Sequence, residues 1–466
     1  MASIRFLGAA GTVTGSRFLV RAHGRAILVD AGLFQGQKAL RLRNWAPFPV
    51  DPRALDAVVL THAHIDHSGA LPLLVRQGFR GPAYCTPATR DLAHLLLPDW
   101  WRLQEEEARY ANEKGYSKHA PNALPLYGEE DAVASLGRLV PIPYRAQRKL
   151  FPGIALNFRR AGHILGSATV ELDIAPEGPA PAVRILFSGD LGRYGAPILP
   201  DPEAAPAADV LLVECTYGDR THSAEPPAEA LRREVHDAVR RAGALLIPAF
   251  AVGRTQEVLF HLRALEAAGS IPALPVFVDS PMAVDATPIY LAHREDHDDE
   301  MARLVASGAE PLRPSRLVFA RSPEQSRAIN RMRGPCIIVS ASGMATGGRV
   351  LHHLKQRLPE ESTTVLLVGY QAAGTRGWSL QNGAASLRIH GEDVPVRARV
   401  TSITGFSAHG DKEEVARWLS TLPAPPGRIF CIHGEPPALG ATAERLSARG
   451  WNARVAVDQE EVDLSA

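Results

Sequence analysis

One nine-residue segment constrains this chain more than any other, because residues 61–69 read THAHIDHSG. The residues just before it are apolar and β-branched, which predicts a buried strand that ends where this segment begins. In an extended chain His62 and His64 point the same way and can bind one ion together. If a helix follows, Asp66 and His67 turn toward a second position. Neutral imidazole and carboxylate groups suit zinc, and four of them within six positions disfavour the alternative of a solvated surface loop.

Three further residues of the same chemical kind stand at the ends of predicted strands. His163 lies between two strands, Asp190 follows an apolar run, and His433 ends a strand near the end of the chain. Each is commonplace alone, but one sheet edge can gather the ends of several strands. The candidate metal ligands are therefore His62, His64, Asp66, His67, His163, Asp190 and His433.

This number of ligands is about what two zinc ions with one shared carboxylate require. A pair of ions roughly 3.5–4 Å apart can generate hydroxide near neutral pH and stabilise both oxygens of a phosphoryl transfer. By role, one ion would take His62, His64 and His163, the other Asp66, His67 and His433, with Asp190 as the bridge. Asp30, at the end of an early strand, suits an acceptor that holds one ligand imidazole in a single tautomer.

Composition narrows the class of protein. A chain of 466 residues with 45% hydrophobic and 22% charged residues predicts a soluble globular protein of two or three domains. No apolar run approaches the length of about 18 residues that a membrane span needs, and the first residues do not read as a secretory signal. The net charge of +1 excludes a global field for polyanions, so nucleic-acid binding would need a local basic cleft. The scattered cysteines Cys85, Cys215, Cys336 and Cys431 predict reduced, buried thiols and a cytoplasmic protein.

The order of the predicted strands and helices divides the chain into parts. Short strands with Gly-containing turns open the chain as an antiparallel meander, and a helix is expected at 89–118. After a Pro/Ala-rich stretch at 198–208, strands and helices alternate, which predicts a parallel sheet covered on both faces. We therefore expect an α/β fold in which a first part, 1–208, is interrupted by an inserted domain, 209–375, and completed by 376–466.

The H-x-H-x-D-H segment with Asp30, His163 and Asp190 resembles the metallo-β-lactamase superfamily. The rest of the chain is similar to its beta-CASP branch, nucleases that include bacterial ribonuclease J and the cleavage-and-polyadenylation endonuclease. The resemblance implies an αββα sandwich with an inserted α/β domain. Three motifs mark that branch, and their matches here are Glu214, His409 and His433.

The resemblance also implies roles for these residues. Glu214 would orient and charge His409, and the resulting imidazolium would protonate the leaving 3′ oxygen. A solvated strand-end glutamate and a helix N-terminal histidine are the alternatives for the two residues taken separately. A histidine at the third motif, His433, points to RNA, because DNA-directed relatives tend to carry an aliphatic residue there.

Loops of small residues are candidates for substrate contacts. Arg254 opens a predicted helix after Gly253, so the guanidinium and the backbone N–H groups there could hold a phosphate. Ser342 and Gly343 belong to a loop that has the shape of a phosphate cradle but lacks the lysine of a P-loop, and Arg376 belongs to a third such loop. A tight turn between elements is the alternative for each.

These observations predict a zinc-dependent ribonuclease that hydrolyses single-stranded RNA by a two-metal hydroxide mechanism, in RNA processing or decay. Asp66 would accept or orient the proton of the attacking water, with Glu214 and His409 as the other catalytic residues. A small-molecule hydrolase of thioesters or lactams is the alternative enzyme, and a non-catalytic scaffold is disfavoured because no ligand position is missing. Internal or 5′-end cleavage, the RNAs cut and the oligomeric state, with a homodimer among the options, stay open.

Overall fold

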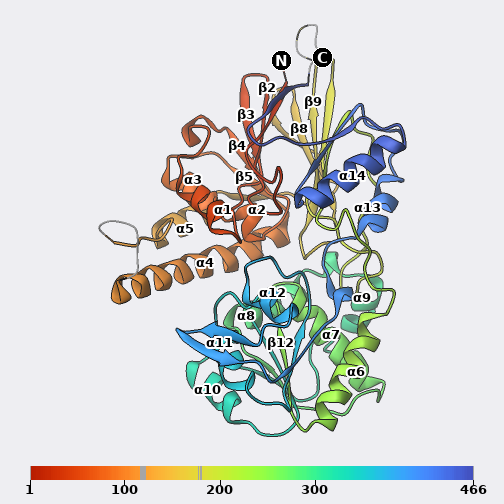
Figure 1. The fold of residues 1–466 in the computed structure, drawn as a ribbon. Helices are drawn as coiled ribbons and strands as arrows, with labels where there is room; N and C mark the ends of the chain where they lie inside the picture. Colours follow the sequence, from red (N-terminus) through yellow and green to blue (C-terminus); the bar gives the residue numbers. More distant parts are fainter. Residues whose placement is uncertain (1, 116–121, 177, 179–180, 465–466) are drawn as a thin grey trace. The chain divides into compact units, whose positions relative to one another are not determined.

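The computed structural model describes residues 2–115, 122–176, 178 and 181–464. The chain forms two compact units (Figure 1). The first contains residues 1–194, 201–221 and 409–466, and the second contains 195–200 and 222–408. Among the described residues, no helix is long and apolar enough to cross a membrane.

The first unit is a sandwich of two sheets. Its first sheet has the order β22 (Glu461–Asp463), β1 (Ser3–Phe6), β2 (Phe18–Ala22), β3 (Arg25–Val29), β4 (Ala57–Val59), β5 (Ala83–Cys85) and β6 (Leu139–Pro141). Its second sheet has the order β21 (Ala453–Val455), β20 (Arg428–Ile432), β11 (Val210–Glu214), β10 (Val183–Phe187), β9 (Ala168–Ile174), β8 (Ile154–Arg160) and β7 (Arg148–Phe151). The predicted opening meander is confirmed, since β1, β2 and β3 pair antiparallel.

The core of this unit lies between the two sheets. Phe6 and Val59 of the first sheet belong to one buried cluster with Phe158, Val170 and Phe430 of the second. Alternate residues of β8 are buried, as expected for a strand with one face on the core. The strands of the two sheets lie side by side in Figure 1.

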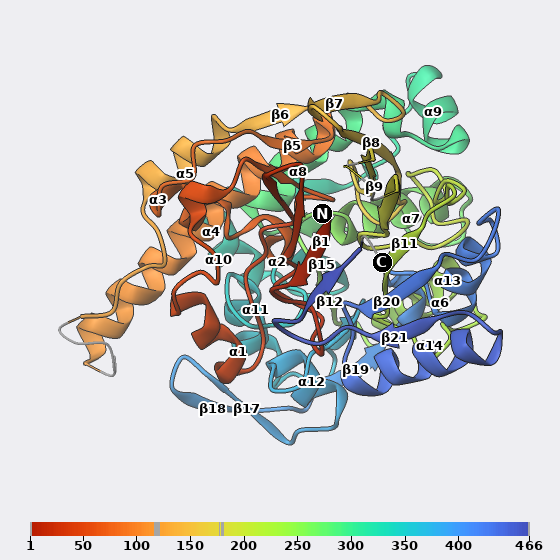
Figure 2. The same ribbon diagram turned by 90° about the horizontal axis from the view of Figure 1, so that it is seen from above.

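Helices cover the outer faces of the sandwich. Its helices are α1 (Lys38–Leu42), α2 (Ile65–Ser68), α3 (Leu71–Arg76), α4 (Pro87–Lys114), α5 (Glu129–Leu136), α13 (Lys412–Leu419) and α14 (Pro436–Ala448). Helices α13 and α14 lie beside β20 and β21 (Figure 2), where Trp418 and Leu439 join a second apolar cluster with Val213 and Ile429. The predicted helix at 89–118 corresponds to α4, and its predicted end at Lys118 lies outside the described residues.

The second unit is an α/β domain with a parallel sheet. The order is β14 (Leu317–Phe319), β13 (Val276–Val278), β15 (Cys336–Ser340), β12 (Ala244–Pro248), β16 (Thr364–Leu367) and β19 (Arg399–Ser402), and all five pairings are parallel. Its helices are α6 (Pro227–Arg240), α7 (Arg254–Ala267), α8 (Pro281–Ala292), α9 (Asp299–Ala306), α10 (Pro323–Arg331), α11 (Val350–Arg357) and α12 (Arg376–Gln381). A hairpin of β17 (Ser386–Ile389) and β18 (Glu392–Pro395) follows α12.

Apolar clusters lie on both faces of this sheet, as the strand–helix alternation predicted. Neighbouring residues of one strand face opposite sides, so Ile247 belongs to one cluster and Leu246 to the other. The four cysteines are free and buried, which confirms the predicted buried thiols.

The unit boundaries differ from those predicted at 208/209 and 375/376. Strand β11, expected in the inserted domain, pairs in parallel with β10 and β20 of the sandwich. Strand β19, which falls within the predicted last part 376–466, instead pairs with β16 of the second unit. A boundary between the units falls within the Pro/Ala-rich stretch 198–208, between Pro200 and Asp201. An apolar pattern identifies a strand but not its neighbours, so it could not fix these positions.

Candidate metal centre

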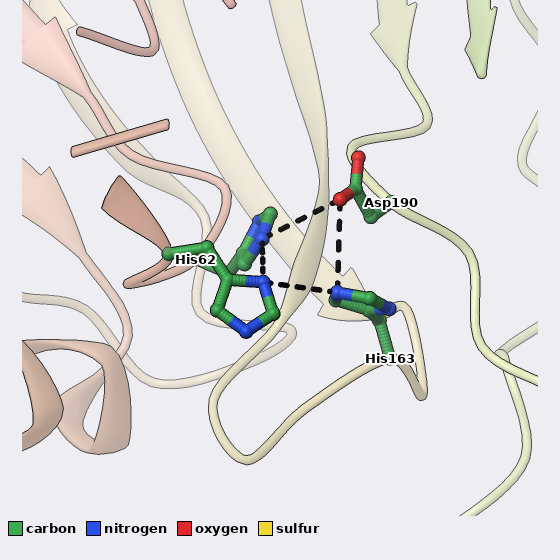
Figure 3. Close-up of side chains that lie close together, drawn as sticks. His62, His163 and Asp190 are labelled. Atoms are coloured by element: carbon green, nitrogen blue, oxygen red, sulfur yellow. Dashed lines mark hydrogen bonds and ion pairs between the residues drawn. The ribbon is translucent and has the colours of Figure 1, made fainter. Parts of the chain in front are cut away.

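The THAHIDHSG segment lies beyond the end of β4, as predicted, and the first turn of α2 follows His64. Nε2 of His62 is 3.0 Å from Nδ1 of His64, and Nε2 of His163 is 3.2 Å from that same nitrogen. Oδ2 of Asp190 is 3.6 Å from Nε2 of both His62 and His163 (Figure 3). These four side chains offer one ligand atom each within 4.8 Å of one another.

A second group adjoins the first. Nε2 of His67 is 3.2 Å from Nε2 of His433, and Oδ2 of Asp66 is 3.6 Å from that His433 nitrogen. The other oxygen of Asp190, Oδ1, lies 3.3 Å from Nε2 of His67. Asp190 therefore faces the first group with one oxygen and the second group with the other.

The side chains present fit zinc. Burial lowers the pKa of His62 well below its usual value and that of His64 to about 4, so both imidazoles are neutral and offer lone pairs at neutral pH. Among the described residues, Oδ1 of Asp190 is a buried oxygen without a hydrogen-bond donor. Burial opposes ionisation of Asp190, but the surrounding histidines hold its pKa well below the usual range. The cluster thus combines two neutral imidazoles, those of His62 and His64, with a buried negative charge that a cation would compensate.

Asp30 orients the imidazole of His67. Nδ1 of His67 is 2.7 Å from Oδ2 of Asp30, so the Nδ1–H donates to the carboxylate and Nε2 faces the cluster. Asp30 has a left-handed backbone (φ 59°) directly after β3, a conformation that aspartate tolerates better than most residues. The burial of Asp30 raises its pKa.

Thr61 also positions these side chains, although it is not among the predicted site residues. Its backbone N–H and hydroxyl both donate to Asp30, the hydroxyl at 2.9 Å from Oδ2. The same hydroxyl is 3.1 Å from Nδ1 of His62. In sequence Thr61 is only the last β-branched residue of a strand, and the one signal available is that it directly precedes the histidines.

Glu214 and His409 lie together at the edge of this cluster. Glu214 is the last residue of β11, and its Oε1 is 3.2 Å from Nδ1 of His409, which lies three residues before α13. Burial opposes protonation of His409, but the charge and hydrogen bond of Glu214, together with the charge of Asp190, raise its pKa to about 9. His409 is therefore an imidazolium at neutral pH, with its ring centroid 4.4 Å from that of His163.

Two of the candidate substrate loops adjoin within the second unit. The hydroxyl of Ser342 accepts from the backbone N–H of Thr346 at 2.9 Å, so the loop satisfies part of its own backbone. A Cβ on Gly343 would lie 2.9 Å from the ring of Phe250, which explains a glycine there. Nη1 of Arg376 donates to the carbonyl of Thr346 at 3.2 Å and thereby links the second and third loops.

Arg254, predicted as a phosphate contact, does not project into solvent. It is buried, with 5% of its surface exposed, and its guanidinium pairs with Glu257 on the same helix. The side chain therefore stabilises the first turn of α7 instead of projecting toward a ligand. A polar residue at a helix start reads the same in sequence whether it faces solvent or the interior.

Comparisons with protein-family models cover most of the chain. The model of the metallo-beta-lactamase superfamily matches residues 10–249, and that of the Beta-Casp domain matches residues 255–380. The chain belongs to the metallo-beta-lactamase superfamily. This member also matches, at residues 393–456, the Zn-dependent metallo-hydrolase RNA specificity domain, so the beta-CASP resemblance and the fold class are confirmed.

Individual relatives support the same family assignment. It is 38% identical to the ribonuclease TTHA0252 of Thermus thermophilus, over 96% of this chain and 97% of the relative. It is 32% identical to the transcription termination factor FttA of Methanocaldococcus jannaschii over 93% of this chain and 67% of FttA. A crystal structure of a protein of unknown function from Enterococcus faecalis V583 shares the fold, with a TM-score of 0.53, 13% identity and 99% of each chain covered.

Proposed function

We propose that this chain is a zinc-dependent ribonuclease that hydrolyses phosphodiester bonds of single-stranded RNA with two zinc ions. The observation that carries the proposal is the pair of ligand groups joined by the two oxygens of Asp190, with the Glu214–His409 pair beside them. A relative of nearly equal length is a ribonuclease, and the match to an RNA specificity domain supports RNA as the substrate.

The ligand assignment follows from the two groups. His62, His64 and His163 would hold one zinc, and Asp66, His67 and His433 the other, with Asp190 shared. Bound zinc would supply the Lewis acidity that makes water nucleophilic near neutral pH and offsets the charge of the phosphate.

The remaining chemistry belongs to the side chains. Asp66 accepts or orients the proton of the attacking water, since its carboxylate lies among the ligands of the second group. Nδ1 of His409 faces Glu214, which leaves Nε2 to donate a proton to the departing 3′ oxygen. We further propose that Ser342, Gly343 and Arg376 would contact the RNA backbone, with the hydrogen bond from Arg376 to the carbonyl of Thr346 holding their two loops together. The free thiols support a reducing compartment, so we place the enzyme in the cytoplasm.

The test is cleavage of end-labelled single-stranded RNA, with zinc measured on the same sample. We expect about two zinc ions per chain, cleavage that a chelator abolishes and zinc restores, and product lengths that distinguish internal from 5′-end cleavage. A DNA strand of the same sequence and a thioester serve as comparison substrates. If zinc-loaded protein leaves RNA intact and hydrolyses the thioester, the chain is a small-molecule hydrolase instead.

A further inference from the structure

We propose that the hydroxyl of Thr216 is a positioning group that connects the Glu214–His409 pair to the metal ligand His433. Thr216 follows β11 by two residues, and its Oγ1 lies 2.6 Å from Oε2 of Glu214 and 3.1 Å from Nδ1 of His433. This inference rests on the proposed function, because it gives His433 the role of a zinc ligand.

The direction of the hydrogen bonds follows from the surroundings of Glu214. Its Oε1 accepts from the backbone N–H of Leu191 at 2.6 Å and faces His409, and its Oε2 accepts from the backbone N–H of Thr216 at 3.3 Å. A carboxyl group surrounded by N–H donors is an acceptor on both oxygens. The hydroxyl of Thr216 also lies 3.4 Å from the carbonyl of His433, but its single proton points to Glu214, which is the shortest of its three contacts.

The consequence for His433 is a fixed tautomer. Since the hydroxyl of Thr216 donates to Glu214, it can only accept from His433, so Nδ1 of His433 carries the proton. Its Nε2 then has the free lone pair, and this is the nitrogen that lies 3.2 Å from Nε2 of His67. The other acceptor near Nδ1, Oδ1 of Asp190, is farther away at 3.6 Å.

The backbone holds His433 in the place where this contact forms. Strands β11 and β20 pair in parallel with Glu214 opposite Ile432, and the N–H of Cys215 donates to the carbonyl of His433 at 3.2 Å. His433 itself has a left-handed backbone (φ 50°) and donates its N–H to the carbonyl of Ala9. The main chain thus sets the position of the ring, and the Thr216 hydroxyl selects which nitrogen is protonated.

The first ligand group contains the same arrangement. The hydroxyl of Thr61 donates to Asp30 and lies 3.1 Å from Nδ1 of His62. In both groups a threonine hydroxyl donates to a buried carboxylate and accepts from Nδ1 of a ligand imidazole. Such partners of metal ligands typically change metal affinity about 10–100-fold when they are removed.

The test compares Thr216→Val, which keeps the shape but loses the hydroxyl, with Thr216→Ser, which keeps the hydroxyl. Zinc affinity is measured by competition with a chelator of known affinity. We expect Thr216→Val to bind one of its two zinc ions about 10–100-fold more weakly, and Thr216→Ser to stay within about threefold of the wild type. Wild-type affinity in Thr216→Val, or equal weakening in both variants, would overturn the proposal.

A second measurement does not depend on how the variants fold. Long-range ¹H–¹⁵N spectra of histidine-labelled, zinc-loaded wild type report which ring nitrogen of His433 carries a proton. We expect the proton on Nδ1, and a proton on Nε2 would refute the proposed role of Thr216. Neither measurement uses RNA. If both measurements give the expected result but the protein leaves RNA intact, the proposed function alone is rejected. If Thr216→Val cleaves RNA normally and binds zinc with unchanged affinity, the positioning role of Thr216 alone is rejected.

Discussion

Replacing His409 with alanine separates proton donation from metal binding. Because the pKa of His409 is raised to about 9, its imidazole carries the proton at pH 7. General-acid catalysis contributes about 10²- to 10⁴-fold, so the variant should lose roughly 3–5 kcal/mol of transition-state stabilisation on RNA. Glu214 keeps its bonds from Leu191 and Thr216, so the pocket and the zinc content should persist.

The assay uses two substrates that differ in the need for a proton. A ribose oxygen leaves RNA poorly unless it is protonated, whereas a nitrophenolate leaves a bis-nitrophenyl phosphodiester without help. We expect His409→Ala to lose about 10²- to 10⁴-fold in kcat on RNA but less than about tenfold on the activated diester. Exposed His94 on α4 offers a matched control, since His94→Ala should leave both rates unchanged.

Two results would refute this reasoning. Equal losses on both substrates would mean that His409 positions the substrate or the metal ions and does not supply the proton. Unchanged RNA cleavage would remove His409 from the mechanism altogether. Zinc content measured on the same samples separates either result from a simple loss of metal.

Three further predictions concern charge. Since Glu214 helps to raise the pKa of His409 to about 9, RNA cleavage should fall as the pH rises through that value, and Glu214→Gln should move this limb to lower pH in a pH–rate profile. Zinc at 100 times its dissociation constant should stabilise the fold by about 2.7 kcal/mol in thermal melts, and His433→Ala should lose part of this gain. Hydrogen bonds from His353, Ser326 and Arg349 lower the pKa of buried Asp279 despite the opposing effect of burial, so its contribution to stability should be present above about pH 4 and vanish as the pH falls further. Asp279→Asn should flatten this acid limb in urea titrations, and an unchanged limb would contradict the assignment.

Much of the candidate ligand set can be predicted from the sequence, because four of its residues are close together in the chain. His62 and His64 are two apart beyond a strand, and Asp66 and His67 begin the helix that follows, so short-range periodicity alone aims them at neighbouring points. The parallel sheet of the second unit is equally predictable from the sequence, because strands buried on both faces appear as continuous apolar runs.

What the sequence does not contain is the pairing of segments far apart in the chain. The parallel register of β11 with β20 brings Thr216 within reach of His433, 217 residues away, although nothing local marks that threonine. Tertiary packing also assigned β19 to the second unit and buried Arg254. An apolar pattern predicts that a segment is buried but does not identify the segment that packs against it. That packing partner determines which polar atoms come into contact. The sequence thus determines the residue types of the candidate metal centre, while the fold determines the orientation of each ring.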